Sequence, residues 1–91
     1  MPKYIIERNI PGVEKLSERD TKAAALNSNR TIAELGPDIQ WHHSYISENR
    51  SHCVYLASNE EILRRHAEKI GTPIISITKV ESVWDPTTAE A

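Results

Sequence analysis

Four stretches of the chain are rich in β-branched and aromatic residues and are predicted to be strands. They span residues 3–8, 38–47, 52–57 and 74–84, and Pro, Gly or short polar turns bound them. Glu48–Ser51 separates the second stretch from the third, which predicts a hairpin. In the fourth stretch the apolar positions change phase near Thr78-Lys79, which indicates a bulge or a break in the strand.

Two stretches between these strands are predicted to be helices. The first follows Ser17, which has Asp20 three residues later in the manner of an N-cap, and it extends to about Leu35. Asn27–Arg30 is a poor helix interior, because short polar side chains compete for backbone hydrogen bonds.

The second helix has the clearer amphipathic pattern. It follows the capping-box sequence Ser58–Glu61 and ends at Gly71. One arc of its helical wheel carries Ile62, Leu63, His66, Ala67 and Ile70. His66 is therefore predicted to point toward the sheet.

The order of these elements predicts the fold. Strand, helix, strand, strand, helix, strand is the ferredoxin-like βαββαβ arrangement of the α+β class, in which two helices cover one face of an antiparallel sheet. We expect a single domain over residues 1–85 and a polar tail over 86–91. The predicted strands carry apolar residues on both faces, so we expect a homodimer in which a second copy covers the open sheet face.

Charge and cysteine content narrow the range of partners. The chain has 91 residues, a net charge of −2 and scattered Lys and Arg residues, which argues against a nucleic-acid or membrane partner. With Cys53 as the single cysteine, no intrachain disulfide can form, and the residues after Met1 lack a signal-peptide pattern. A cytoplasmic location is expected.

The predicted hairpin gathers most of the metal-binding side chains. His42 and His43 lie on its first strand, and His52 and Cys53 lie on its second. Imidazole and thiolate bind borderline and softer divalent metals, so these residues are candidate ligands. Adjacent strand residues point to opposite faces, however, which keeps His42 and His43 from holding one ion together.

The expected register of the hairpin also separates the imidazoles. With a two-residue turn at Asn49-Arg50, His43 faces Leu56 and lies about 13 Å along the sheet from His52, at about 3.3 Å per residue. A compact site of four ligands is therefore not expected within the hairpin. A metal would bind at the surface with two or three protein ligands and water, or between subunits.

A second hypothesis places a pocket between the sheet and the helices. Trp41, His43 and Tyr45 are expected to share a face, and if that face is the helix side, His43 and His66 converge there with Cys53 nearby. Such a pair of imidazoles would suit metal binding or acid-base chemistry.

Each of these residues also has a structural interpretation. His43 and His66 could be packed histidines satisfied by hydrogen bonds, and Cys53 is typical of a small buried hydrophobe, because no base is placed to form its thiolate. His42 and His52 are expected to be exposed, where any histidine binds divalent metal weakly.

Five segments together suggest a family resemblance that covers nearly the whole chain: Met1–Gly12, Leu35–Trp41, His43–Tyr45, Cys53–Tyr55 and Asp85–Thr88. Through them the chain resembles a bacterial domain-of-unknown-function family of small proteins often labelled nickel-binding proteins. It implies a ferredoxin-like dimer that binds nickel ions at its surface and has no established enzyme activity. His43, Cys53 and His66 match the family pattern, whereas His42 and His52 depart from it.

Three functions compete at this point. The first is a small cytoplasmic protein that binds nickel or another divalent metal through its histidines. The second is an enzyme similar to the dimeric α/β-barrel monooxygenases and isomerases, with Trp41 and Tyr45 lining an apolar pocket and His43 and His66 as acid-base groups. The third is an interaction module whose histidines are structural.

Overall fold

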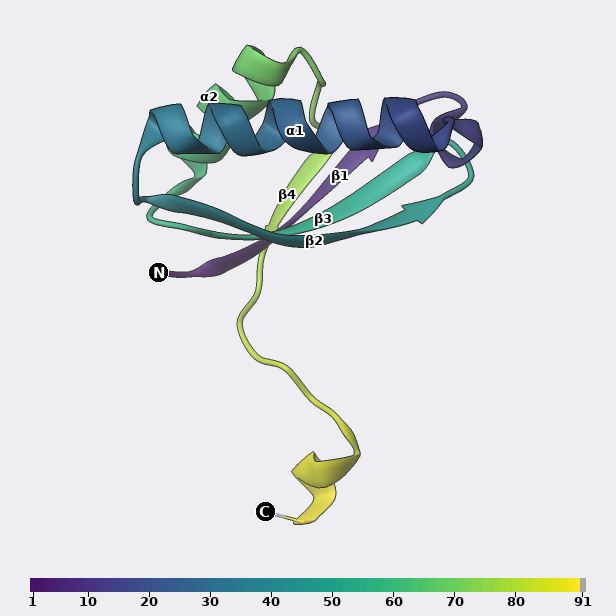
Figure 1. The fold of residues 1–91 in the computed structure, drawn as a ribbon. Helices are drawn as coiled ribbons and strands as arrows, with labels where there is room; N and C mark the ends of the chain where they lie inside the picture. The colour runs from purple at the N-terminus through teal and green to yellow at the C-terminus, as the bar shows by residue number, and fades with distance from the viewer. Residues whose placement is uncertain (91) are drawn as a thin grey trace.

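The computed structural model describes residues 1–90 and contains the predicted strands and helices in the predicted order (Figure 1). In chain order the elements are β1 (Lys3–Asn9), the 3₁₀ helix η1 (Val13–Lys15), α1 (Glu18–Leu35), β2 (Ile39–Ser47), β3 (Arg50–Ala57), α2 (Glu60–Ile70), β4 (Ser76–Lys79) and the 3₁₀ helix η2 (Pro86–Glu90). Among residues 1–90 no helix is both long and apolar enough to cross a membrane.

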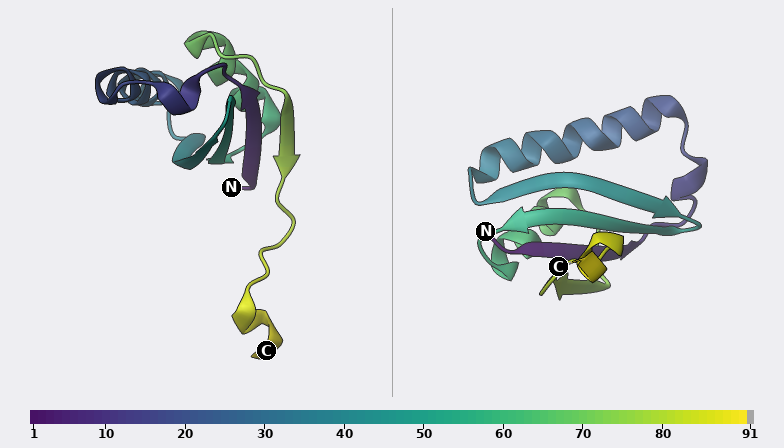
Figure 2. Two further views of the ribbon diagram at one scale, coloured as in Figure 1. Left: turned by 90° about the vertical axis from the view of Figure 1, so that its right-hand side faces the viewer. Right: turned by 90° about the horizontal axis from the view of Figure 1, so that it is seen from below.

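The four strands form one antiparallel sheet in the order β2-β3-β1-β4. Both α-helices lie on the same face of this sheet, and the other face is left open (Figures 1 and 2). This is the predicted ferredoxin-like α+β fold. The core fills the space between the helices and the sheet and consists of Tyr4, Ile6, Ile39, Cys53, Tyr55, Ala57, Ile62 and Leu63.

Both helices begin at capping side chains, although one cap differs from the prediction. Ser17 Oγ accepts from the Asp20 backbone N–H at 3.1 Å, and α1 then continues unbroken to Leu35. For α2 the cap is Asn59, whose Oδ1 accepts from the backbone N–H of Ile62 at 3.1 Å. The expected cap, Ser58, instead donates to Asp38 Oδ1 at 2.9 Å.

The hairpin between β2 and β3 turns at Glu48-Asn49, so the expected turn at Asn49-Arg50 was wrong. Ser47 pairs with Arg50, and β3 begins two residues earlier than predicted. The physical reason is backbone conformation: Asn49 has φ 59°, a left-handed conformation that asparagine tolerates better than arginine. The change moves the cross-strand partners of residues 43–47 by two positions, and an irregularity between Trp41 and His43 adds one more position for residues 39–41.

Asn49 also ties this turn to the connection between β1 and α1. Its Oδ1 accepts from the Gly12 backbone N–H at 2.8 Å, and its carbonyl accepts from the Ile10 N–H at 2.9 Å. Its own N–H donates to Glu14 Oε1 at 3.2 Å. One residue, through its side chain and its backbone, therefore couples two loops that are far apart in the sequence.

β4 is shorter than the predicted strand over residues 74–84. Its last ladder bond runs from the Val80 N–H to the Lys3 carbonyl at 2.9 Å, and β1 begins at Lys3, so β4 has no further backbone to pair with. The phase change near Thr78-Lys79 therefore marks the end of the strand. Residues 80–90, here called the C-terminal arm, extend away from the sheet on the side opposite the helices (Figures 1 and 2).

Replacement of Asn49 tests its role in the hairpin. Asn49→Ala should lower the free energy of unfolding by about 2 kcal/mol, because it removes the bond to Gly12 and places a Cβ-bearing residue with no local polar partner at positive φ. Asn49→Gly removes only the bond and should cost about 1 kcal/mol or less. Urea denaturation measures both, with Glu48→Ala as the neighbouring control. Equal losses for the Ala and Gly variants would contradict a conformational requirement at this position.

Candidate functional site

A β-bulge at His42 decides which side chains share a face of the sheet. Trp41 pairs with Tyr55 and His43 pairs with Val54, so β2 contains one residue more than β3 at this point. Because Tyr55 and Val54 are adjacent on β3, they face opposite sides of the sheet, and so do Trp41 and His43. The expectation that Trp41 and His43 share a face was therefore wrong.

The open face carries two of the candidate histidines. His43 packs edge-on against Tyr45, with ring centroids 5.1 Å apart, and Tyr45 pairs directly with His52 across the hairpin. His43 and His52 are thus diagonal neighbours, for which a Cα separation of about 7–8 Å is typical, rather than the expected 13 Å. The observed register therefore places His43 and His52 closer together than the sequence predicted.

His52 has a carboxylate partner on the neighbouring strand. Its Nε2 lies 3.5 Å from Oε1 of Glu7, which pairs with it across β1 and β3. The other carboxylate oxygen of Glu7 lies 3.9 Å from Arg50 Nε. These side chains are about one-third to two-fifths exposed, so the group is open to solvent.

Metal ligands are otherwise dispersed. His42 is exposed at the bulge. In the described part of the chain, no three His, Cys, Asp or Glu side chains lie close enough together to hold one metal ion. One chain therefore offers at most a pair of ligands at any one place.

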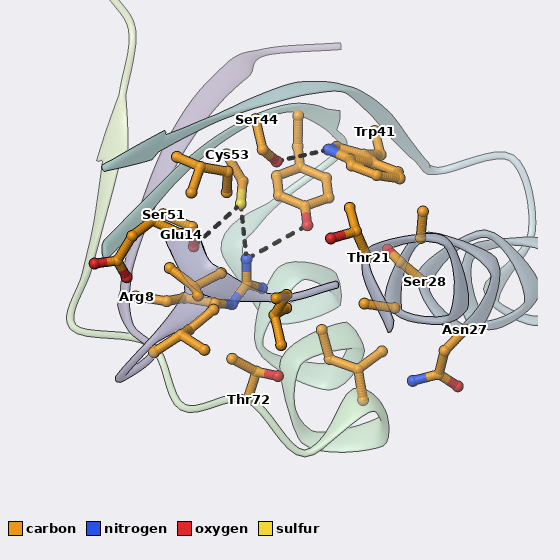
Figure 3. A pocket seen from close by; sticks show the side chains of 18 residues that line it. Arg8, Glu14, Thr21, Asn27, Ser28, Trp41, Ser44, Ser51, Cys53 and Thr72 are labelled. Atoms are coloured by element: carbon orange, nitrogen blue, oxygen red, sulfur yellow. Dashed lines mark hydrogen bonds between the residues drawn. The ribbon is translucent and has the colours of Figure 1, made fainter. Parts of the chain in front are cut away.

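The helix face carries a cavity of about 570 Å³ between α1, α2 and the sheet (Figure 3). Trp41 and Cys53 are part of its lining, whereas Tyr45 is 64% exposed on the opposite face. Trp41 Nε1 donates to Ser44 Oγ at 2.9 Å, which holds the indole at the cavity wall. Of the three side chains proposed to form a pocket, two line this cavity.

His66 is completely buried beside the cavity and does not meet His43. Its Nε2 lies 3.2 Å from Ser28 Oγ, and its ring packs edge-on against Tyr55 at 5.5 Å. Burial, reinforced by the positive charge of Arg8, lowers the pKa of His66 to about 4, so the imidazole is neutral at pH 7. The proposed convergence of His43 and His66 does not occur, because the sheet lies between them.

Two further residues whose charged side chains could take part in binding were not singled out from the sequence. Glu7 and Arg8 are neighbours on β1 and face opposite sides of the sheet, Glu7 toward the open face and Arg8 into the core, where it is 2% exposed. Strand alternation was a usable signal for Arg8, since Tyr4 and Ile6 precede it at two-residue spacing. Glu7 became notable only when the register placed His52 beside it.

Comparisons with known proteins agree with this fold. A family described as Nickel responsive protein SCO4226-like matches residues 4–80. Among solved structures, the chain is similar to the one titled crystal structure analysis of SCO4226 from Streptomyces coelicolor A3(2). The TM-score is 0.72 at 13% sequence identity, over 90% of this chain and 99% of that one. At this identity the likeness shows a shared fold. No curated protein matches the sequence.

The lowered pKa of His66 predicts a loss of stability in acid. Below pH 6.5 the unfolded chain takes up a proton at His66 that the folded chain does not accept until about pH 4. Stability is therefore highest above pH 6.5 and falls as the pH approaches 4, by up to about 3 kcal/mol from this residue.

Urea denaturation between pH 7 and pH 4, with a chelator present, measures this effect. His66→Gln should lose less stability over that interval than the wild type, whereas the exposed control His42→Gln should follow the wild type. Parallel curves for wild type and His66→Gln would show that His66 is not buried in its neutral form.

Proposed function

The chain belongs to the nickel responsive SCO4226-like family, and on that basis we propose that it binds nickel or another divalent ion on the open face of its sheet. The observation that carries the proposal is the pair formed by His52 and Glu7, with Nε2 and Oε1 3.5 Å apart on neighbouring strands. Both side chains reach solvent, so an ion can approach without opening the core.

The donor set of this pair is compatible with nickel. Imidazole nitrogen suits nickel, and carboxylate oxygen is a common additional ligand, although copper normally binds the same donors more tightly. Two side chains leave most of the coordination positions of an ion to other donors. Water, or side chains of a second chain such as His43 and the same pair, would supply them.

The other candidate histidines are less suited to this role. His66 is fully enclosed by the core, so an ion would have to displace packed side chains to reach it. His42 is exposed but stands outside the cross-strand ladder, and no carboxylate forms an ion pair with it in residues 1–90. We therefore assign the principal role to His52, with His43 second.

A homodimer through the open face would complete this arrangement. Ile5 and Tyr45 are 37% and 64% exposed there. Val83 and Trp84, 71% and 81% exposed, belong to the C-terminal arm, which projects on the same side of the sheet (Figure 2). A twofold axis brings the same patch of both copies together, so it can double the number of ligands near the axis.

The lone thiol of Cys53 is in keeping with a cytoplasmic location.

Nickel titration calorimetry of single variants tests the metal site. His52→Ala and Glu7→Gln should each weaken binding at least tenfold, about 1.4 kcal/mol, because each removes one of two protein donors. Arg50→Gln should strengthen binding, since Arg50 competes for the carboxylate of Glu7 at 3.9 Å. His42→Ala and His66→Gln serve as controls and should bind as the wild type does.

Two results would argue against this site. An equal loss in His42→Ala and His52→Ala would indicate incidental binding by surface imidazoles. Absence of any nickel binding by the wild type at neutral pH would remove the proposal altogether.

The dimer has its own test. Light scattering coupled to size-exclusion chromatography should give twice the chain mass of 10.3 kDa. Tyr45→Lys should shift the protein toward the monomer, because it places a charge on the proposed interface. Leu26→Lys is the matched control, since Leu26 is 54% exposed on α1. A wild-type monomer over the whole micromolar range would contradict the dimer.

A further inference from the structure

The cavity on the helix face is lined by a buried charge that has no counter-ion among residues 1–90. Most of its exposed surface is apolar, and polar side chains reach it from α1, the strands, η1 and the segment after α2 (Figure 3). Arg8 enters from β1 and is 2% exposed, although a guanidinium carries a full positive charge at any physiological pH. Taking such a charge out of water is strongly unfavourable unless an opposite charge compensates it.

Only one of the three guanidinium nitrogens of Arg8 has hydrogen-bond partners among the described residues. Its Nη1 donates to Cys53 Sγ at 3.3 Å and to Tyr55 Oη at 3.4 Å, and its Cζ lies 5.8 Å from the Tyr55 ring centroid. Nε and Nη2 are buried and have no hydrogen-bond partner in the described residues. Arg8 takes part in none of the ion pairs found there.

The one carboxylate among the residues that line the cavity is directed elsewhere. Glu14 lies at the rim of the cavity, where its carboxylate accepts from the Asn49 backbone N–H at 3.2 Å. This bond belongs to the loop contact that holds the hairpin turn. No carboxylate that lines the cavity therefore neutralises the positive charge of Arg8, and a ligand in the cavity could do so.

The two free nitrogens determine what that ligand would be. Nε and Nη2 carry parallel N–H groups along one edge of the guanidinium, the edge that binds a carboxylate through two hydrogen bonds. One positive charge in a mainly apolar wall balances a monoanion and leaves a phosphate dianion undercompensated. About 570 Å³ lies within the range of small-molecule sites and exceeds what a carboxylate alone would fill.

We propose that this cavity binds a small amphipathic monocarboxylate. Its carboxylate pairs with Nε and Nη2 of Arg8, and its hydrocarbon part lies against Trp41 and the alanine-lined side of α1. This site is separate from the proposed metal site, because Arg8 and Glu7 face opposite sides of the sheet. The proposal therefore stands or falls independently of nickel binding.

Intrinsic fluorescence provides a direct measurement with octanoate as the probe. The chain has two tryptophans, Trp41 at the cavity and Trp84, which is 81% exposed on the C-terminal arm. In a Trp84→Phe background, all tryptophan emission reports on the cavity. Octanoate should change this emission saturably in the presence of a chelator, and octanol should bind at least tenfold more weakly.

Arg8→Met separates the charge from the apolar volume. It should weaken octanoate binding at least tenfold and leave octanol binding unchanged, and its thermal midpoint without ligand should equal or exceed that of the parent, since an unpaired buried charge is gone. Arg50→Met, which removes a guanidinium from the open face, is the control and should bind octanoate normally. Equal binding of octanoate by Arg8→Met and by its parent overturns the proposal.

A second variant keeps the test valid if Arg8→Met does not fold. Ala25→Phe places a ring in the cavity from α1 and leaves Arg8 intact. It should abolish the octanoate response and leave nickel binding unchanged. If octanoate binds this variant as it binds the parent, or never saturates the parent, the cavity is not a carboxylate site.

Discussion

The division of the β2 side chains between the two faces of the sheet depends on one extra residue in this strand. The bulge at His42 shifts the alternation of side chains along β2 by one residue. As a result, Trp41 lines the cavity on the helix side, and His43 lies with Tyr45 on the open face. Without it, strand alternation would place His43 on the helix side with Trp41. The bulge therefore separates an apolar compartment from a polar, imidazole-bearing surface across the thickness of a single sheet.

The two faces also differ in how far their charged and titratable groups are exposed to water. On the open face Glu7, Arg50 and His52 remain partly hydrated, so their interactions with one another are weak. On the helix face burial keeps His66 neutral at pH 7, and Arg8 has no counter-ion among the described residues. The family to which the chain belongs is described by its response to nickel, which accords with the hydrated face; the Arg8 cavity requires a separate explanation.

Much of the fold could be predicted because it depends on local patterns. Ser17 caps α1 and Gly71 ends α2 in the left-handed conformation, as their sequence contexts indicated. The amphipathic arc of α2 correctly placed His66 toward the core. The choice between two adjacent capping residues was predicted less accurately. Asn59 caps α2 in place of Ser58, because Ser58 instead bonds to Asp38 in a different part of the chain.

The sequence by itself determined the order of elements, the helix face that is buried and the presence of a hairpin rich in imidazole, because these follow from residue periodicity and local backbone preference. Only the tertiary structure decided the partners across strands. A turn displaced by one residue and a bulge of one residue are small local changes, and Asn49 selects the turn through contacts with Gly12 and Ile10, far away in the sequence. Since strand side chains alternate at every residue, the bulge placed Trp41 and His43 on opposite faces, and the displaced turn made His43 a diagonal neighbour of His52.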